Sequence, residues 1–142
     1  METTSRKSLF EYFKAAFLGA LILITIMYLL MITGLAGNPG FVNIYHAILG
    51  EYMPVLDHFL AALLFAISGG IWGLVFRLIP NPSPIKGMIF GILPSLWLWI
   101  VVSPIVSGLF FNGFTFKGIL LPLLFNCIIW GSFVGWYVST DQ

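Results

Sequence analysis

The sequence predicts an all-α integral membrane protein, a bundle of four transmembrane helices that occupies residues 1–142 as a single membrane domain. The first observation behind this prediction is composition: 60% of the 142 residues are hydrophobic, 8% are charged, and the mean hydropathy is +1.05. Soluble domains are nearer half apolar and a quarter charged, so the composition excludes that class. The second observation is a set of four apolar runs, each long enough to cross a hydrocarbon core about 30 Å thick. The runs show no strict alternation, which favours helices over barrel strands.

The four predicted spans cover residues 15–35, 55–77, 88–110 and 118–138. The first span carries no charged residue, and its length suits a single crossing. An alternative treats it as a secretory signal peptide with a small-residue cleavage site at Gly34-Leu35-Ala36. The apolar part of a cleaved signal usually spans about 7–15 residues, and this run is longer. We therefore expect the first span to be retained.

Basic residues are distributed unevenly between the two sides of the predicted bundle. Five of the six lysines and arginines precede the first span or flank the turn between the second and third: Arg6, Lys7, Lys14, Arg77 and Lys86. The connection over residues 36–54 contains none, and the last connection contains only Lys117. By the positive-inside rule, both termini are predicted to be cytoplasmic.

The long connection between the first two spans contains a predicted helix over residues 39–50. Asn38 followed by Pro39 is typical of a helix start, whereas Gly50 and Pro54 are typical of its end. Apolar residues recur at helical spacing on one face: Phe41, Ile44, Tyr45, Ile48 and Tyr52. The other face carries Asn43, His46 and Gly50. We expect a short amphipathic helix in the outer interface, with its apolar stripe against lipid or the bundle.

Short turns and small residues predict how the spans pack. The proline-stiffened turn over residues 80–84 predicts that the second and third spans are antiparallel neighbours. Small residues about four apart let helix backbones approach closely in lipid, where no hydrophobic force drives association. They are Ala15 and Gly19, then Ala62, Ala66, Gly69, Gly70 and Gly73, then Gly87, Gly91 and Ser95, and finally Gly131 and Gly135. Two interpretations stay open: packing within the chain, or docking of another subunit on at least one stripe.

The interiors of the predicted spans carry no ionisable side chain, and such side chains are the usual sign of chemistry or transport inside a membrane. We therefore predict that the chain is not an enzyme. A net charge of +1 argues against a nucleic-acid-binding surface. Asn126 is the most polar side chain deep in a span, and we expect it to hydrogen-bond across helices. Cys127 beside it is expected to be a small apolar filler.

A cluster of titratable residues marks the outer boundary: His46, Glu51, Asp57 and His58, with no lysine or arginine nearby. Two imidazoles and two carboxylates can bind a divalent metal or relay a proton from a quinol headgroup. Their spacing matches no tight metal motif, so no metal is assigned. Asp57 and His58 are adjacent and therefore project in different directions. The alternative is a solvated loop, with Asp57 favouring a helix N-terminus.

Three tryptophans, Trp97, Trp99 and Trp130, fall near the middle of spans rather than at interfaces, where tryptophan concentrates. They are expected either to pack within the bundle or to stack on a quinone, pigment or lipid tail. A haem is disfavoured, because both histidines lie outside the apolar spans. No cofactor is assigned, and a quinone or a bound lipid stays open.

Two segments carry a resemblance to a known group of proteins. One is Lys86-Gly87-Met88-Ile89-Phe90-Gly91-Ile92-Leu93-Pro94, and the other runs from His58-Phe59 to Gly69-Gly70-Ile71-Trp72-Gly73. Together they resemble the YagU-like group of small, uncharacterised, four-helix bacterial inner-membrane proteins. In that group a polar residue precedes the glycines of the last span, a position that Asn126 holds here. The resemblance implies a four-helix fold in a bacterial inner membrane and implies no mechanism.

These observations lead to three hypotheses about function. The first is a non-catalytic accessory or structural subunit of a larger membrane complex of respiratory or photosynthetic type, with the bilayer and other membrane subunits as partners. The second is a protein that binds a quinone, a lipid or a metal at the outer boundary through the His46, Glu51, Asp57 and His58 cluster. The third is a small transporter that is active only as an oligomer, which requires a polar cavity near Asn126.

Overall fold

The computed structural model describes residues 7–139, and its regular secondary structure over that range is entirely helical. Four helices are long and apolar enough to cross a membrane: Leu9–Ile32, Pro54–Phe76, Pro84–Ser107 and Phe116–Ser139. The fold class predicted from composition is thereby confirmed as an all-helical, multi-pass membrane protein. The first two are the unbroken helices α1 (Leu9–Ile32) and α3 (Pro54–Phe76), and α2 (Gly40–Leu49) lies between them.

Helix α1 begins six residues before the predicted span and ends three residues before its predicted end. The Ser8 side chain accepts a hydrogen bond from the Glu11 amide at 3.2 Å and so caps the first turn. Glu11 and Lys14 lie on this turn, 3.4 Å apart. A hydropathy run stops at such charges, whereas the helix continues through them because its ends can lie among lipid headgroups.

Two segments of the third and fourth spans are not α-helical, and prolines lie beside both. The third span comprises α4 (Pro84–Phe90), α5 (Ile92–Trp97), a π-helical segment η1 (Leu98–Val102) and α6 (Ser103–Ser107). After a 3₁₀ turn η2 (Phe110–Phe114), the fourth span comprises α7 (Phe116–Leu123), π-helical η3 (Leu124–Gly131) and α8 (Ser132–Ser139). Pro94 and Pro122 each lack the amide that regular α-helical bonding requires, which kinks or loosens a helix nearby.

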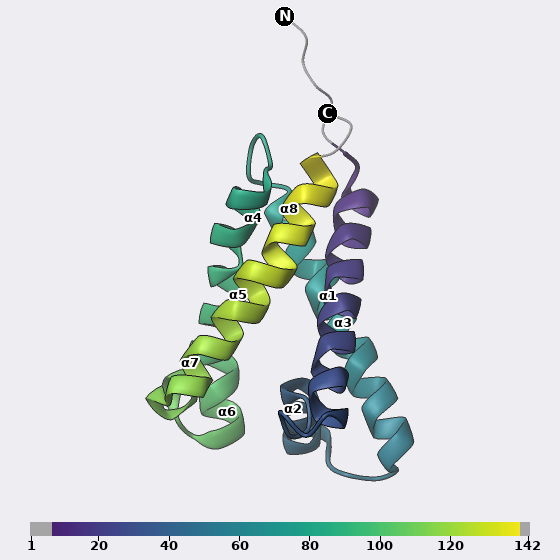
Figure 1. Cartoon of the computed structure of the whole chain (residues 1–142), viewed down its shortest axis with the longest axis vertical. Coiled ribbons are helices and arrows are strands. Elements are labelled where there is room, and N and C mark those ends of the chain that lie inside the picture. Colours follow the sequence, from purple (N-terminus) through teal and green to yellow (C-terminus); the bar gives the residue numbers. More distant parts are fainter. Residues whose placement is uncertain (1–6, 140–142) are drawn as a thin grey trace, which may run out of the picture.

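The helices form two antiparallel pairs, α1 with α3 and the third span with the fourth (Figure 1). In the first pair, a Cβ added at Gly73 would lie 2.3 Å from Ala16 Cβ and 2.6 Å from the Tyr12 carbonyl oxygen. In the second, a Cβ at Gly87 would lie 2.0 Å from the Gly131 carbonyl oxygen. Both seams therefore require glycine, and Gly73, Gly87 and Gly131 pack within the chain.

The principal core joins the two pairs through large aromatic residues. Phe90 of α4 lies 5.0 Å from Phe76 of α3 and 6.2 Å from Trp130 of η3, measured between ring centroids. Tyr12 of α1 contacts Phe76 from the other side, at 6.1 Å. The second and third spans thus meet through aromatic rings, whereas the close backbone contacts of the third span are with the fourth. The short turn over residues 80–84 predicted that the second and third spans are direct neighbours. In the structure, the glycines of α4 instead allow its closest backbone contacts with η3 and α8 of the fourth span.

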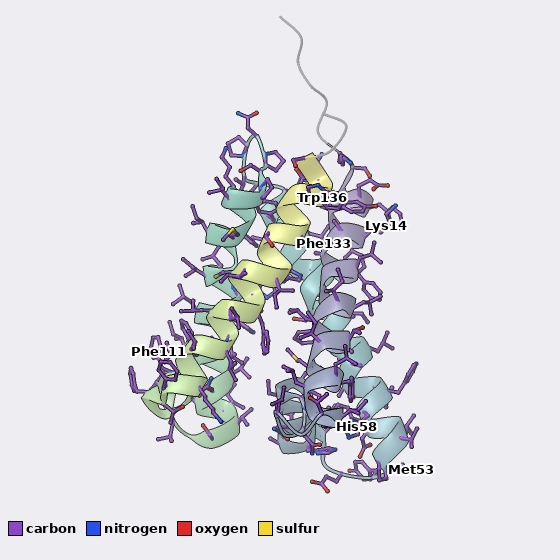
Figure 2. All side chains as sticks on the ribbon, in the orientation of Figure 1. Lys14, Met53, His58, Phe111, Phe133 and Trp136 are labelled. Atoms are coloured by element: carbon purple, nitrogen blue, oxygen red, sulfur yellow. The ribbon has the colours of Figure 1, made fainter. Side chains whose placement is uncertain are left out.

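Both ends of the described chain lie together, and the two helix pairs diverge toward the other end (Figure 1). We name the end with the described termini the basic end, because it carries Lys7, Lys14, Arg77 and Lys86. Its loops are tied together: Lys7 Nζ donates to the Tyr137 carbonyl at 3.3 Å, and Arg77 Nε donates to the Lys7 carbonyl at 3.1 Å. We name the opposite end the histidine end, because it carries His58 (Figure 2) and α2, which contains His46.

Helix α2 packs on α3 at the histidine end. Phe41 and Val42 are buried against Ala61, and the Phe41 ring stacks on Phe65 at 5.0 Å. Of the predicted apolar face, Phe41 is thus buried against the bundle, whereas Ile48 is exposed, as a residue facing lipid would be.

Candidate functional site

Three of the four predicted boundary residues meet around one imidazole at the histidine end. His46 lies near the end of α2, Glu51 in the following loop and Asp57 in the first turn of α3. His46 Nδ1 lies 3.5 Å from Glu51 Oε1, and His46 Nε2 lies 3.6 Å from Asp57 Oδ2. The chain reverses at Gly50, whose φ of 87° suits glycine, and this turn brings Glu51 back toward the ring.

Asp57 is the most deeply buried of these groups, with only 2% of its surface exposed. Its Oδ2 accepts a hydrogen bond from the Tyr52 amide at 2.8 Å, so the carboxylate also fastens the α2–α3 loop. The sequence predicted that Asp57 favours a helix N-terminus, and it does lie in the first turn of α3. That prediction did not anticipate its burial beneath α2.

His58 projects away from this group and pairs with a residue that the sequence interpretation did not single out. Its Nδ1 lies 2.8 Å from the Tyr28 hydroxyl of α1, and the two rings are 5.8 Å apart. A signal for Tyr28 was present in the sequence. Tyr28 lies four residues before the end of α1 and His58 four residues after the start of α3, so antiparallel helices place them at one depth.

The geometry of His46 does not suit a shared metal ion. Glu51 and Asp57 face different nitrogens of the ring, so one ion cannot bind all three side chains through adjacent ligand atoms. Across residues 7–139, no group of three or more His, Cys, Asp or Glu side chains is arranged to hold a metal. The contacts of Asp57 with His46 and with the Tyr52 amide instead hold α2 and its loop against the start of α3.

The three mid-span tryptophans do not come together, and two of them are fixed within the bundle. Trp130 is buried, and its Nε1 donates to the Ala16 carbonyl of α1 at 3.0 Å. Trp99 is buried, and its Nε1 donates to the Gly118 carbonyl at 3.0 Å. Pro122 explains the second bond, because a proline at this position leaves the Gly118 carbonyl without its usual helical donor.

Trp97 differs from the other two. It lies at the centre of the third span with half of its surface exposed. Within residues 7–139 its indole N–H makes no hydrogen bond. Trp136 is similarly exposed but lies near the end of the fourth span, where headgroups and water are within reach. Of the three predicted mid-span tryptophans, Trp97 is therefore the one whose indole points out of the bundle.

Polar side chains deep in the third and fourth spans are satisfied by one another and by the backbone. Asn126 Nδ2 donates to Ser95 Oγ at 3.0 Å, as predicted for a buried amide in a span. Ser95 is fully buried, and its hydroxyl lies 3.1 Å from the Gly91 carbonyl and 3.3 Å from that of Pro122. The second acceptor belongs to a proline-containing turn, so the kink and the hydrogen bonds support each other.

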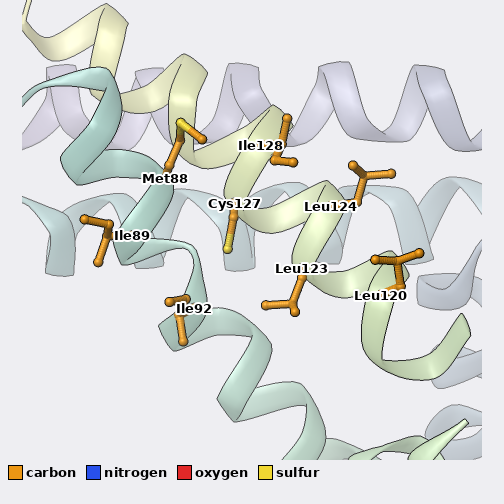
Figure 3. A pocket seen from close by; sticks show the side chains of 8 residues that line it. All are labelled: Met88, Ile89, Ile92, Leu120, Leu123, Leu124, Cys127 and Ile128. Carbon is orange, nitrogen blue, oxygen red and sulfur yellow. The ribbon is translucent and has the colours of Figure 1, made fainter. Parts of the chain in front are cut away.

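An apolar groove of about 330 Å³ follows the outside of the same seam (Figure 3). Its lining is Met88, Ile89, Ile92, Leu120, Leu123, Leu124, Cys127 and Ile128. Cys127 acts there as a small apolar side chain, as expected. The groove can accommodate an apolar chain, but its lining offers no polar group that would orient a headgroup.

Comparison of the chain with protein-family models, with curated proteins and with solved structures finds no match. The resemblance to the YagU-like group therefore stays a prediction, and function must be argued from the geometry.

Proposed function

We propose that this multi-pass membrane protein is a non-catalytic accessory or structural subunit of a larger membrane complex, of respiratory or photosynthetic type. The observation that supports the proposal is the outward-facing indole of Trp97 at mid-span depth. Leu93 and Ile100 are also exposed on this span, one helical turn to either side. We define the Trp97 face as these three residues.

The energetic argument concerns the indole N–H. A polar N–H without an acceptor in an apolar medium costs about 1–3 kcal/mol by protein mutational data. Lipid tails contain no acceptor, whereas the other two mid-span tryptophans, Trp99 and Trp130, each donate to a backbone carbonyl within the fold. The Trp97 face thus suits a partner helix that offers a backbone carbonyl, a hydroxyl or an amide at the same depth.

The test uses a photo-crosslinking amino acid placed at position 97 in the full chain, expressed in its own membrane. We expect an adduct with a transmembrane segment of another protein. The control places the same group at Trp136, which is equally exposed but near the span end, and should yield mainly lipid adducts. Lipid adducts alone at both positions would contradict the proposal.

A substitution then tests the hydrogen bond itself. Trp97→Phe keeps an aromatic ring and removes the N–H, so recovery of the complex in mild detergent should fall by about tenfold, equivalent to about 1.4 kcal/mol. Trp136→Phe should leave recovery unchanged. Equal recovery of the two variants, or a solitary wild-type monomer from native membranes, would count against a subunit role.

The proposal includes an orientation and a location. With the basic end cytoplasmic, Lys7, Lys14, Arg77 and Lys86 obey the positive-inside rule, and both termini face the cytoplasm of a bacterial inner membrane. Helix α2 then lies at the outer interface, as the amphipathic pattern predicts.

The other hypotheses have less support. A quinone, lipid or metal site at the outer boundary needs free ligand atoms, whereas His58 is engaged by Tyr28 and the His46 nitrogens face two carboxylates. A transporter needs a polar path near Asn126, whose amide is bonded to Ser95 in a tightly packed seam. We therefore do not propose either function.

A further inference from the structure

Lys117 differs from the other basic residues that the structure describes. The other four lie at the basic end, and each donates a hydrogen bond within the chain: Lys7, Lys14, Arg77 and Lys86. Lys117 lies at the start of α7, at the histidine end, and its side chain is exposed (Figure 1). Within residues 7–139 it makes no hydrogen bond and no ion pair, and the third and fourth spans contain no aspartate or glutamate. Its ammonium group is therefore free to bind an anion from outside the chain.

The apolar groove on the outside of the third and fourth spans ends one helical turn from Lys117 (Figure 3). Leu120, the lining residue nearest to it in the sequence, lies three positions further along α7, and Leu124 lies four positions beyond that. Residues three or four apart share one face of a helix, so Lys117 lies in line with the groove. A helical side chain leans toward the start of its helix, so the ammonium group extends away from the apolar lining and toward the headgroups.

The depth of the groove matches one leaflet of a bilayer. Eleven positions separate Lys117 from Ile128, the last lining residue of the fourth span, which corresponds to about 16 Å at 1.5 Å per residue. One leaflet contributes about 15 Å to a hydrocarbon core about 30 Å thick. A lipid whose phosphate lies at Lys117 can therefore place one acyl chain along the whole groove.

We propose that Lys117 and this groove form a binding site for an anionic phospholipid of the leaflet at the histidine end. The ammonium group binds the lipid phosphate, and one acyl chain lies in the groove. The lining has no polar group, so the preference for an anionic headgroup comes from Lys117 alone. The site shares no residue with the Trp97 face or with the titratable cluster at the outer boundary, and no covalent bond is made or broken.

A lysine also lies near the opposite end of the groove. Lys86 precedes Ile89 of the lining by three residues on α4, but its Nζ donates to the Pro80 carbonyl at 2.7 Å. This hydrogen bond holds the ammonium group against the turn that precedes α4. Lys86 is therefore the matched control for charge at one end of the same groove.

Cys127 allows a test of the groove independently of the headgroup. It has the smallest of the eight lining side chains, and it lies between the two sides of the groove (Figure 3). Cys127→Phe places an aromatic ring in the space that the acyl chain requires, whereas Cys127→Ala leaves that space open.

The test is native mass spectrometry of the purified full chain in mild detergent, titrated with phosphatidylglycerol and separately with phosphatidylcholine. We expect one phosphatidylglycerol to bind about fivefold more tightly than phosphatidylcholine, because one lysine near an anionic lipid surface contributes about that factor. Lys117→Gln, a change at an exposed position, should make the two affinities equal. Lys86→Gln should keep the preference. Equal affinities in the wild-type chain, or a preference that is lost in Lys86→Gln and kept in Lys117→Gln, would overturn the proposal.

The groove variants distinguish a bound lipid from a charge at the surface. Cys127→Phe should weaken the binding of both lipids at least about fivefold, and Cys127→Ala should bind them as the wild type does. Glycerol 3-phosphate, which carries a phosphate without acyl chains, should not compete with phosphatidylglycerol at equal concentration. Effective competition would show that Lys117 binds a free phosphate, and a protein dimer that excludes the lipid would show that a second copy of the chain occupies the groove. Either result would overturn the proposal.

Discussion

The basic half and the histidine half of the bundle use different means to hold the third and fourth spans together. In the basic half, the backbone of α4 touches that of the fourth span, as at Gly87 against Gly131, the last residue of η3, and at Gly135 of α8 against the Ser83 carbonyl. Toward the histidine end the spans include π-helical segments and are joined by side-chain hydrogen bonds, such as Asn126 to Ser95 and Trp99 to Gly118.

The difference teaches how proline changes the means of association in lipid. A regular α-helix satisfies its own backbone, so association needs only close contact, and glycine allows it. A proline frees a carbonyl, which then requires a donor from another helix. The Gly118 carbonyl, four residues before Pro122, accepts from both Trp99 and Asn112, at 3.0 and 2.9 Å. Pro122 thus creates an acceptor that helps to join the spans.

The largest effect should come from breaking the backbone contact. Gly87→Ala places a Cβ 2.0 Å from the Gly131 carbonyl oxygen, so α4 and the fourth span must separate. We expect a loss of about 3 kcal/mol in the free energy of unfolding, measured by denaturant titration in mixed micelles. Gly37→Ala is the matched control, because no atom lies within 4 Å of its added Cβ. Equal stability of the two variants would show that the seam can relax.

An intermediate effect should follow from removing one hydrogen bond between the helix pairs. Trp130→Phe keeps a buried aromatic ring but removes the N–H that reaches the Ala16 carbonyl, so stability should fall by about 2 kcal/mol. Trp72→Phe serves as the control, because within the described residues its N–H donates no hydrogen bond. If both variants lose the same amount, ring size rather than the hydrogen bond joins the pairs.

The smallest effect should come from the polar contact near the middle of the fourth span. Asn126→Leu removes the donor to Ser95, while the serine hydroxyl keeps its backbone acceptors. Hydrogen bonds between membrane helices average about 0.6 kcal/mol, and we expect a loss of that size in the same titration. A loss above about 2 kcal/mol would contradict the difference between the two halves, because one polar hydrogen bond would then stabilise the seam about as much as the backbone contact does.

Much of the fold could be predicted because lipid imposes strong constraints. Four apolar runs had to be helices, and the glycines at Gly87 and Gly131 had to lie where backbones meet. The π-helical segments and the pairing of the third span with the fourth could not be predicted, because they depend on which freed carbonyl finds which donor. The Ser95 hydroxyl, which serves Asn126 and two carbonyls, carried no signal of that role beyond its place in a small-residue stripe.

The sequence predicted which residues gather at the candidate site, but it did not predict which of them contact one another. The sequence grouped His46, Glu51, Asp57 and His58, and it indicated that adjacent Asp57 and His58 diverge, which the structure shows. It placed His46 on the polar face of α2, but the buried face depends on how the loop returns through Gly50. The sequence did not distinguish among Trp97, Trp99 and Trp130. The structure shows that the Trp97 indole is exposed, whereas the indoles of Trp99 and Trp130 each donate to a backbone carbonyl.

The division into two helix pairs has a consequence for biosynthesis. Each pair is a hairpin of consecutive spans, so the first can close in the membrane while the ribosome is still making the second. The bond from Trp130 to Ala16 connects residues 114 positions apart and cannot form until nearly the whole polypeptide has been inserted. Until then the first hairpin must survive alone in the bilayer with Gly19, which later contacts Trp130 and Val134, facing lipid.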